Sequence, residues 1–209
     1  MKLGIMVDVL PGGPGTRAAR DMAMNEKHHA SLKQYVNDML ALERAIANAV
    51  RGQLEDERVT AVSGLAGLLG EMAGGSESRI DRLKALSEAE RGSVGAAIKE
   101  TVTAVTGTLA GLYGKVREHP VSRMVRDDVV ALNLSSTSYS MLLTLGLAVG
   151  HNGCATLAEE GLRATAKLLM KLTNMVPLVV AGELAEDAPL ASPNAVQLAH
   201  AKLEEAWSA

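Results

Sequence analysis

Thirty consecutive residues near the middle of the chain, Val129 to Ala158, include no Asp, Glu, Lys or Arg. A stretch of this length without charge favours a position at the centre of the fold, because the surfaces of soluble proteins usually carry charged side chains. The rest of the chain is therefore expected to pack around it. The few polar side chains within the stretch become candidates for function.

Aromatic residues are scarce, with three Tyr, one Trp and no Phe among 209 residues. Strands usually recruit aromatic and β-branched residues, so this scarcity favours close-packed helices. It also removes the stacking platforms on which single-stranded nucleic acids bind. The net charge of −3 is made of interspersed acidic and basic residues, and no basic face indicates a nucleic-acid partner.

The compartment is inferred from one cysteine and from the first residues. Cys154 is the single cysteine, so it cannot form an internal disulfide and fits a reducing environment. The opening MKLGIMVDVLPGG has a short apolar run interrupted by Asp8, which is too short and too polar for a signal peptide. These features predict a cytoplasmic protein.

Apolar residues recurring at helical spacing predict a series of long helices and a short tail helix. The predicted segments are about 31–57, 59–90 with a break at Gly74 and Gly75, 94–117, 121–150, 154–176 with a kink or stop at Pro177, and a tail after Asn194. Residues 1–28 are interpreted as a flexible N-terminal arm, 29–186 as the helical domain, and 187–209 as a linker and the tail helix.

One face of the predicted central helix is polar without being charged. At about 100° per residue a group of small polar side chains falls together. The group is Asn133, Ser136, Thr137, Ser140 and Thr144, with His151 in line one turn beyond. Such hydroxyls either bond backward to the carbonyl four residues earlier and let helices approach, or line a small-molecule cavity.

The same helix is long enough to be tested as a membrane span. Val129 to Gly150 would cross a bilayer as a helix. Its polar side chains, and the lack of an aromatic belt or of Lys/Arg asymmetry at its ends, speak against that. No membrane span is predicted.

Two runs carry a resemblance to a known family. YVNDMLALERAI in the first helix and GLYGKVREHPVSRMVRDDVVALNLSSTSYSMLLTLGLAVG across the inserted and central helices resemble bacterial ferritin-like proteins, over about residues 30–186. The resemblance implies an all-α, ferritin-like four-helix bundle with an inserted helix between helices 2 and 3 and a short C-terminal tail helix. A homo-oligomer, with a dimer favoured, is expected.

The resemblance also implies where two metal ions would be held, by carboxylates and histidines from all four helices. Glu43 occupies the position of the first-helix ligand, where it either points inward as a ligand or pairs with a cation or reaches solvent. The other ligand positions carry no carboxylate or imidazole. They are held by Gly75, Arg79, Leu132, Asn133, Ser136, Ala164 and Thr165. One inward Glu cannot balance two divalent ions, so the resemblance implies a degenerate metal site.

The preferred interpretation is a metal-free protein without catalytic residues or cofactor, which acts in interactions or binds a small neutral or apolar ligand. The candidate ligand-binding residues are Glu43, Asn133, Ser136, Tyr139, Ser140 and Thr144. The alternative is an iron or manganese oxidoreductase or metal-storage protein. Its ligands would be Glu43, Glu77, Asp81, Glu159 and Glu160.

Three other acidic residues, Glu26, Asp127 and Asp128, are not interpreted as metal ligands. Glu26 and His29 form the only Glu-x-x-His spacing, which stands before the first strong helical pattern and is interpreted as a solvated lead-in. Asp127 and Asp128 are expected to precede the core section of the central helix.

Overall fold

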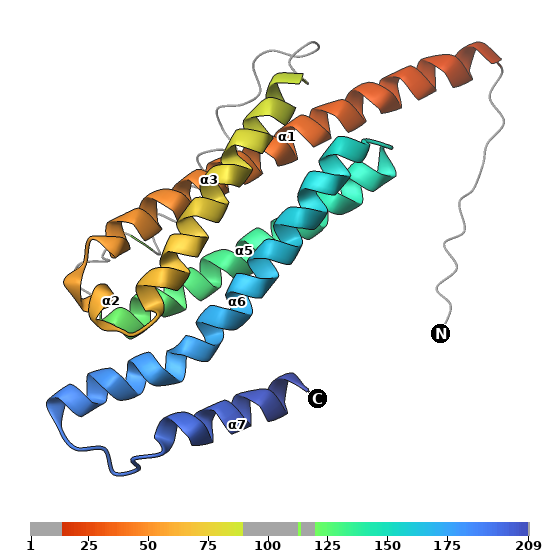
Figure 1. Cartoon of the computed structure of the whole chain (residues 1–209). Helices are drawn as coiled ribbons and strands as arrows, with labels where there is room; N and C mark the ends of the chain where they lie inside the picture. Colours follow the sequence, from red (N-terminus) through yellow and green to blue (C-terminus); the bar gives the residue numbers. More distant parts are fainter. Residues whose placement is uncertain (1–13, 90–112, 114–119, 209) are drawn as a thin grey trace.

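A computed structural model describes residues 14–89, 113 and 120–208, with side chains from Glu26 onward. This part of the chain forms six helices and no strand, so the predicted all-helical class is confirmed (Figure 1). The helices are α1 Pro14–Leu54, α2 Glu57–Ala61, α3 Leu65–Ala89, α5 Val121–Ala148, α6 Asn152–Asp187 and α7 Ala195–Trp207. The helix predicted at 94–117 lies outside the described residues, apart from Tyr113.

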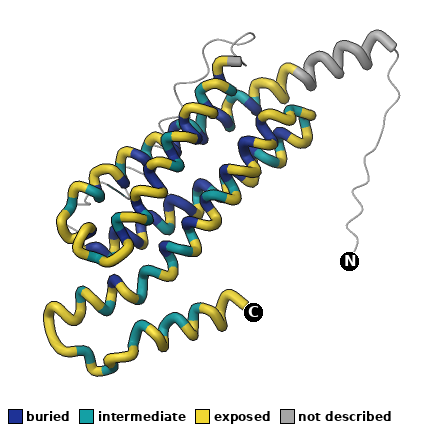
Figure 2. The backbone as a smooth tube through the Cα atoms, viewed as in Figure 1, coloured by how far each residue is buried: buried dark blue, intermediate teal, exposed yellow. Residues whose placement is uncertain are grey.

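The four long helices lie side by side. α1 packs against α3 and α5 packs against α6, while α1 also contacts α5 and α3 contacts α6. Buried residues line the sides on which these helices face one another (Figure 2). The core is mainly Leu, Val, Met and Ala, and Tyr139 is the largest of its fully buried side chains.

α1 begins at Pro14, so residues 14–28, which were expected to belong to a flexible arm, are part of a helix of 41 residues. Pro is favoured at the first position of a helix, where its missing N–H costs no hydrogen bond. Between Gly15 and Gly52 there is no Gly or Pro, and Ala is the most frequent residue, followed by Arg. These residues favour continuous helix, which explains the early start.

The break expected at Gly74 and Gly75 occurs earlier, between α2 and α3. Gly64 lies at this break with a φ of 81°, a left-handed conformation that glycine adopts without strain. Gly74 and Gly75 lie inside α3. The low helix propensity of this glycine pair, about 1 kcal/mol for each residue, is therefore not enough to interrupt α3.

The last long helix continues through Pro177 to Asp187. Its C-terminal part changes direction in Figure 1, in agreement with the kink predicted from the missing proline N–H. α7 then folds back beside α6, where a ring nitrogen of His200 lies 2.8 Å from the carbonyl oxygen of Asn174. No residue of α7 is buried, and Trp207 is 62% exposed.

The uncharged central stretch is buried on one side only. Leu132, Tyr139 and Leu142 of α5 belong to the core. On the opposite side Met141 is 48% exposed and Leu147 is 65% exposed. The expectation that the whole stretch lies at the centre therefore holds for one face of α5, and its other face is an uncharged part of the surface.

By length and composition, α6 is the only described helix that could cross a membrane, with a mean hydropathy of 1.4 over its most apolar window. A core helix of a soluble protein meets the same criterion, but such a helix is mostly buried, whereas 17% of this window in α6 is buried. α5, the helix considered for this role from the sequence, does not meet it.

Candidate functional site

A polar cluster lies buried between the four long helices, with Glu43 of α1 at its centre. Glu43 has no exposed surface. Arg79 of α3 binds both of its carboxylate oxygens, with Nε 2.9 Å from Oε1 and Nη2 3.0 Å from Oε2. From α5, the Tyr139 hydroxyl donates to Oε1 at 2.8 Å and Ser135 Oγ donates at 3.3 Å. Arg79 Nη2 also donates to Ser76 Oγ at 3.1 Å.

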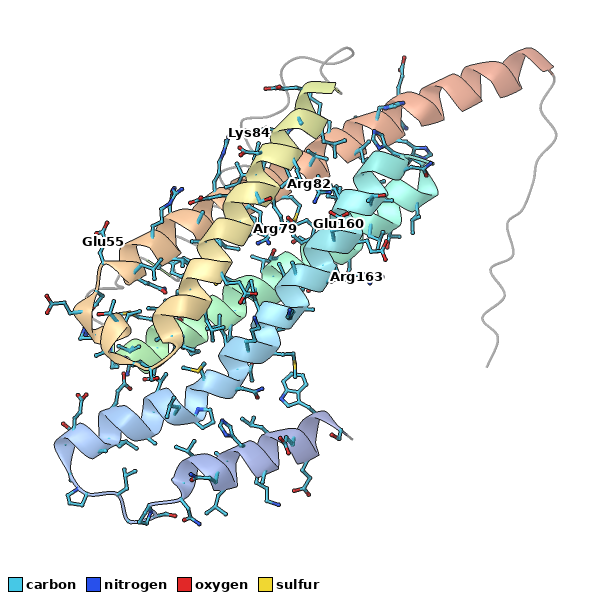
Figure 3. The ribbon with its side chains drawn as sticks, viewed as in Figure 1. Glu55, Arg79, Arg82, Lys84, Glu160 and Arg163 are labelled. Carbon is cyan, nitrogen blue, oxygen red and sulfur yellow. The ribbon has the colours of Figure 1, made fainter. Side chains whose placement is uncertain are left out.

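Helical spacing brings these side chains together. Ser76 and Arg79 are three residues apart on α3, and Ser135 and Tyr139 are four apart on α5, so each pair shares one face of its helix. Glu43 follows Met39 by four residues on the buried face of α1. The three faces meet at one level of the structure, with Arg79 pointing between the helices (Figure 3).

The charges within the cluster balance. A two-bond arginine–carboxylate pair is among the stronger hydrogen-bonded contacts in proteins. Burial lowers the pKa of Arg79, but the Glu43 carboxylate more than offsets this, so the pKa of the guanidinium is raised above its usual value. Burial, followed by the charge of Glu43, also raises the pKa of Tyr139, which keeps its phenol protonated as a donor.

Two glycines make room for the cluster. A Cβ atom at Gly75 would lie 3.0 Å from Arg79 Nη1, and one at Gly161 of α6 would lie 2.5 Å from a ring carbon of Tyr139. From the sequence, Gly75 was interpreted as part of a helix break and as a metal-ligand position without a ligand, and Gly161 was not singled out. The spacing of four residues between Gly75 and Arg79 puts both on one face of the helix, and it could have indicated that Gly75 leaves room for the arginine side chain.

The described residues do not fit a pair of divalent metal ions. Among them, no three His, Cys, Asp or Glu side chains lie together in a way that could hold a metal. Both oxygens of Glu43 are taken by a cationic side chain. At the corresponding place on α6, Thr165 bonds the Gly161 carbonyl at 2.9 Å and accepts a hydrogen bond from Ser136 at 2.9 Å.

The other residues of the metal alternative lie at the surface, and none contacts Glu43. Each forms an ion pair with a basic side chain, and Figure 3 labels some of the residues involved. The pairs are Arg51–Glu77, Lys84–Asp81, Arg163–Glu159 and Arg82–Glu160. Glu26 and His29 are exposed on α1.

The polar side chains of α5 mostly bond to their own helix. Asn133 donates to the Val129 carbonyl, Ser140 to the Ser136 carbonyl and Thr144 to the Ser140 carbonyl, at 2.9–3.1 Å. His151 accepts from the backbone N–H of Cys154 at 3.0 Å and caps α6. The predicted backward bonding is thus confirmed, although Asn133, Ser140 and Thr144 face outward rather than into a buried seam.

A groove of about 550 Å³ lies beside three polar side chains of α5, Thr137, Ser140 and Thr144. It is lined by Ser31, Tyr35, Thr137, Ser140, Met141, Thr144, Leu145 and Ala148, from α1 and α5. Ser140 and Thr144 are the two predicted ligand-binding residues that line it, whereas Glu43, Asn133, Ser136 and Tyr139 do not. Ser31 and Tyr35 were missed, although their spacing of four places them on one face of α1.

Comparison with protein-family models, curated proteins and solved structures gives no match for this chain.

Proposed function

We propose that this protein is a metal-free, ferritin-like four-helix bundle that binds a small, uncharged and largely apolar molecule in the groove between α1 and α5. The observation that carries the proposal is the groove itself, because none of its eight lining residues is charged. Its volume of about 550 Å³ falls in the range of small-molecule sites, which are mostly apolar with a few polar groups.

The lining residues suit such a ligand. Met141, Leu145 and Ala148 offer apolar contacts. Ser140 and Thr144 line the groove and give their protons to backbone carbonyls, so each hydroxyl oxygen can still accept a hydrogen bond. A charged ligand would lose solvation in this groove without gaining an opposite charge in return.

The polar cluster at the centre supports a function without metal chemistry. A dinuclear iron or manganese site built on Glu43 would require Arg79 to leave a two-bond ion pair and further carboxylates to move in from the surface. The proposal therefore assigns no catalytic step to Glu43 and treats it as a structural residue. It also retains the expected cytoplasmic homodimer, and a monomer in sedimentation velocity would contradict the dimer.

Replacing Thr144 with Trp is expected to weaken binding of the uncharged naphthalene dye prodan about tenfold or more, because the indole fills the groove. Dye fluorescence in a titration measures the dissociation constant. Asn133→Trp is the matched control, since Asn133 is also exposed on α5, also bonds the carbonyl four residues earlier, and does not line the groove.

Two results would count against the proposed function. One is a wild-type protein that binds no prodan, or binds it equally well in both Trp variants. The other is about two iron or manganese ions per chain in protein from metal-supplemented cells, lost in Glu43→Ala.

A further inference from the structure

A second buried polar cluster joins the C-terminal end of α1 to the N-terminal end of α5. Asp128 of α5 has no exposed surface, and the adjacent Asp127 is 3% exposed, so the two aspartates expected ahead of the core section are in fact inside it. Gln53 of α1 is fully buried beside Asp128. Tyr113, which precedes α5 in the chain, completes the cluster.

The two carboxyl oxygens of Asp128 have different surroundings. Oδ1 accepts two hydrogen bonds, from Gln53 Nε2 at 3.0 Å and from the Tyr113 hydroxyl at 3.0 Å. Oδ2 is buried and has no partner among the described residues. Gln53 Oε1 is likewise buried without a partner there. The cluster therefore holds two unpaired acceptors on two groups that are already bonded to each other.

This pattern matches a carboxylic acid better than a carboxylate. A neutral acid has one carbonyl oxygen that accepts two hydrogen bonds and one hydroxyl that donates one. Leaving a buried acceptor without a donor destabilises the folded state, and one proton on Oδ2 would provide a partner for both unpaired atoms. We propose that Asp128 is protonated in the folded protein at mildly acidic pH and donates its Oδ2–H to Gln53 Oε1, so that acid and amide form a cyclic pair of hydrogen bonds between α5 and α1.

The electrostatic surroundings favour the neutral form. Burial raises the pKa of Asp128 to about 7, and the Asp127 charge adds to this, while the hydrogen bonds from Gln53 and Tyr113 act in the opposite direction. Asp127 is itself paired with Arg126 at 2.6 Å. Within the described residues no Lys or Arg contacts Asp128, and α1 offers it only the uncharged Gln53 amide.

Folding would then take up a proton. The pKa of Asp128 is raised in the folded state, compared with about 3.9 in the unfolded chain. Its contribution to the free energy of unfolding is therefore fully present below about pH 3.9 and is lost as the pH rises through about 7. Between these values the unfolding equilibrium constant should rise by up to about tenfold per pH unit from this site. Ionised Asp128 would loosen the contact between α1 and α5.

Asp128→Asn tests the proposal, because Asn is shaped like the neutral acid and can donate from Nδ2 to Gln53 Oε1. Urea unfolding from pH 5 to 9 should show wild-type stability falling relative to the variant, with the variant at least about tenfold less prone to unfold at pH 8. Asp127→Asn, at the neighbouring buried aspartate, should keep the fall in stability with rising pH, with its midpoint moved to lower pH because the Asp127 charge helps to raise the pKa of Asp128. An infrared band of a protonated carboxyl at pH 6 should be absent from Asp128→Asn.

An ionised Asp128 that shares a bridging water with Gln53 would give the opposite result. Wild type and Asp128→Asn would then have parallel pH profiles, and the infrared band would be the same in both proteins. If Asp128→Asn does not fold, the carboxyl-carbon NMR resonance of Asp128 in wild-type protein gives the answer. A titration midpoint near 7 supports the proposal, and a midpoint near 4 overturns it.

Discussion

Arg79→Met is expected to lower the free energy of unfolding by about 3–5 kcal/mol, the range found when one partner of a buried ion pair is removed. Met fills much of the arginine volume, but it leaves the Glu43 carboxylate in the core without a cation. The remaining donors, Tyr139 and Ser135, both act on Oε1 and cannot replace a charge. Urea denaturation followed by circular dichroism measures the loss.

Two further variants separate the charge effect from general damage. In the double variant Glu43→Gln/Arg79→Met much of the lost stability should return, because the amide still accepts from Tyr139 and no buried charge remains. Arg82→Met removes an exposed ion pair with Glu160 and should cost less than about 1 kcal/mol. If the Arg79→Met protein were as stable as the Arg82→Met protein, the buried Glu43–Arg79 pair would not contribute to the free energy of unfolding as expected.

Gly161→Ala is expected to cost about 1–3 kcal/mol, because the new methyl group overpacks the core against the buried Tyr139 ring. The Cβ atom would lie 2.5–2.8 Å from three ring carbons, and the ring is fixed at its hydroxyl end by Glu43. Tyr139 therefore cannot give way without weakening the polar cluster. Thermal and urea unfolding both report this change.

Gly182→Ala is the matched control on the same helix, since a Cβ there meets no atom within 4 Å. It should stabilise the protein by up to about 1 kcal/mol, which is the difference in helix propensity between Gly and Ala. Equal effects of the two substitutions would mean that Tyr139 does not pack against α6.

The polar side chains at the centre of the fold already form hydrogen bonds or ion pairs within the protein. The carboxylate of Glu43 is bound by Arg79, Tyr139 and Ser135, and the Thr165 hydroxyl is bound within α6 and to Ser136. Among the described residues, the polar side chains of this central cluster are therefore bonded to one another or to their own helix. The proposed binding surface is therefore the uncharged outer face of α5, beside α1.

Local sequence patterns determined the helical class and most of the helix positions. The start of α5 after Pro120, its end near Gly150 and the tail helix after Asn194 follow from turn residues and apolar spacing. The same patterns predicted the backward hydrogen bonds of Ser140 and Thr144, because those bonds depend only on residues four positions apart. The length of α1 was underestimated, since mixed charge after Pro14 was interpreted as an arm although its residues are good helix formers.

The tertiary structure alone decided which face of each helix is buried and which side chains meet. Glu43 and Arg79 are 36 residues apart in the chain, and Gln53 and Asp128 are 75 apart. Helical periodicity gives the faces of one helix, but the rotation and level at which two helices pack depend on side-chain shapes across the contact. For this reason the uncharged stretch marked the right helix, while its division into a core face and an exposed groove became clear only from the packing of α1 and α6 against it.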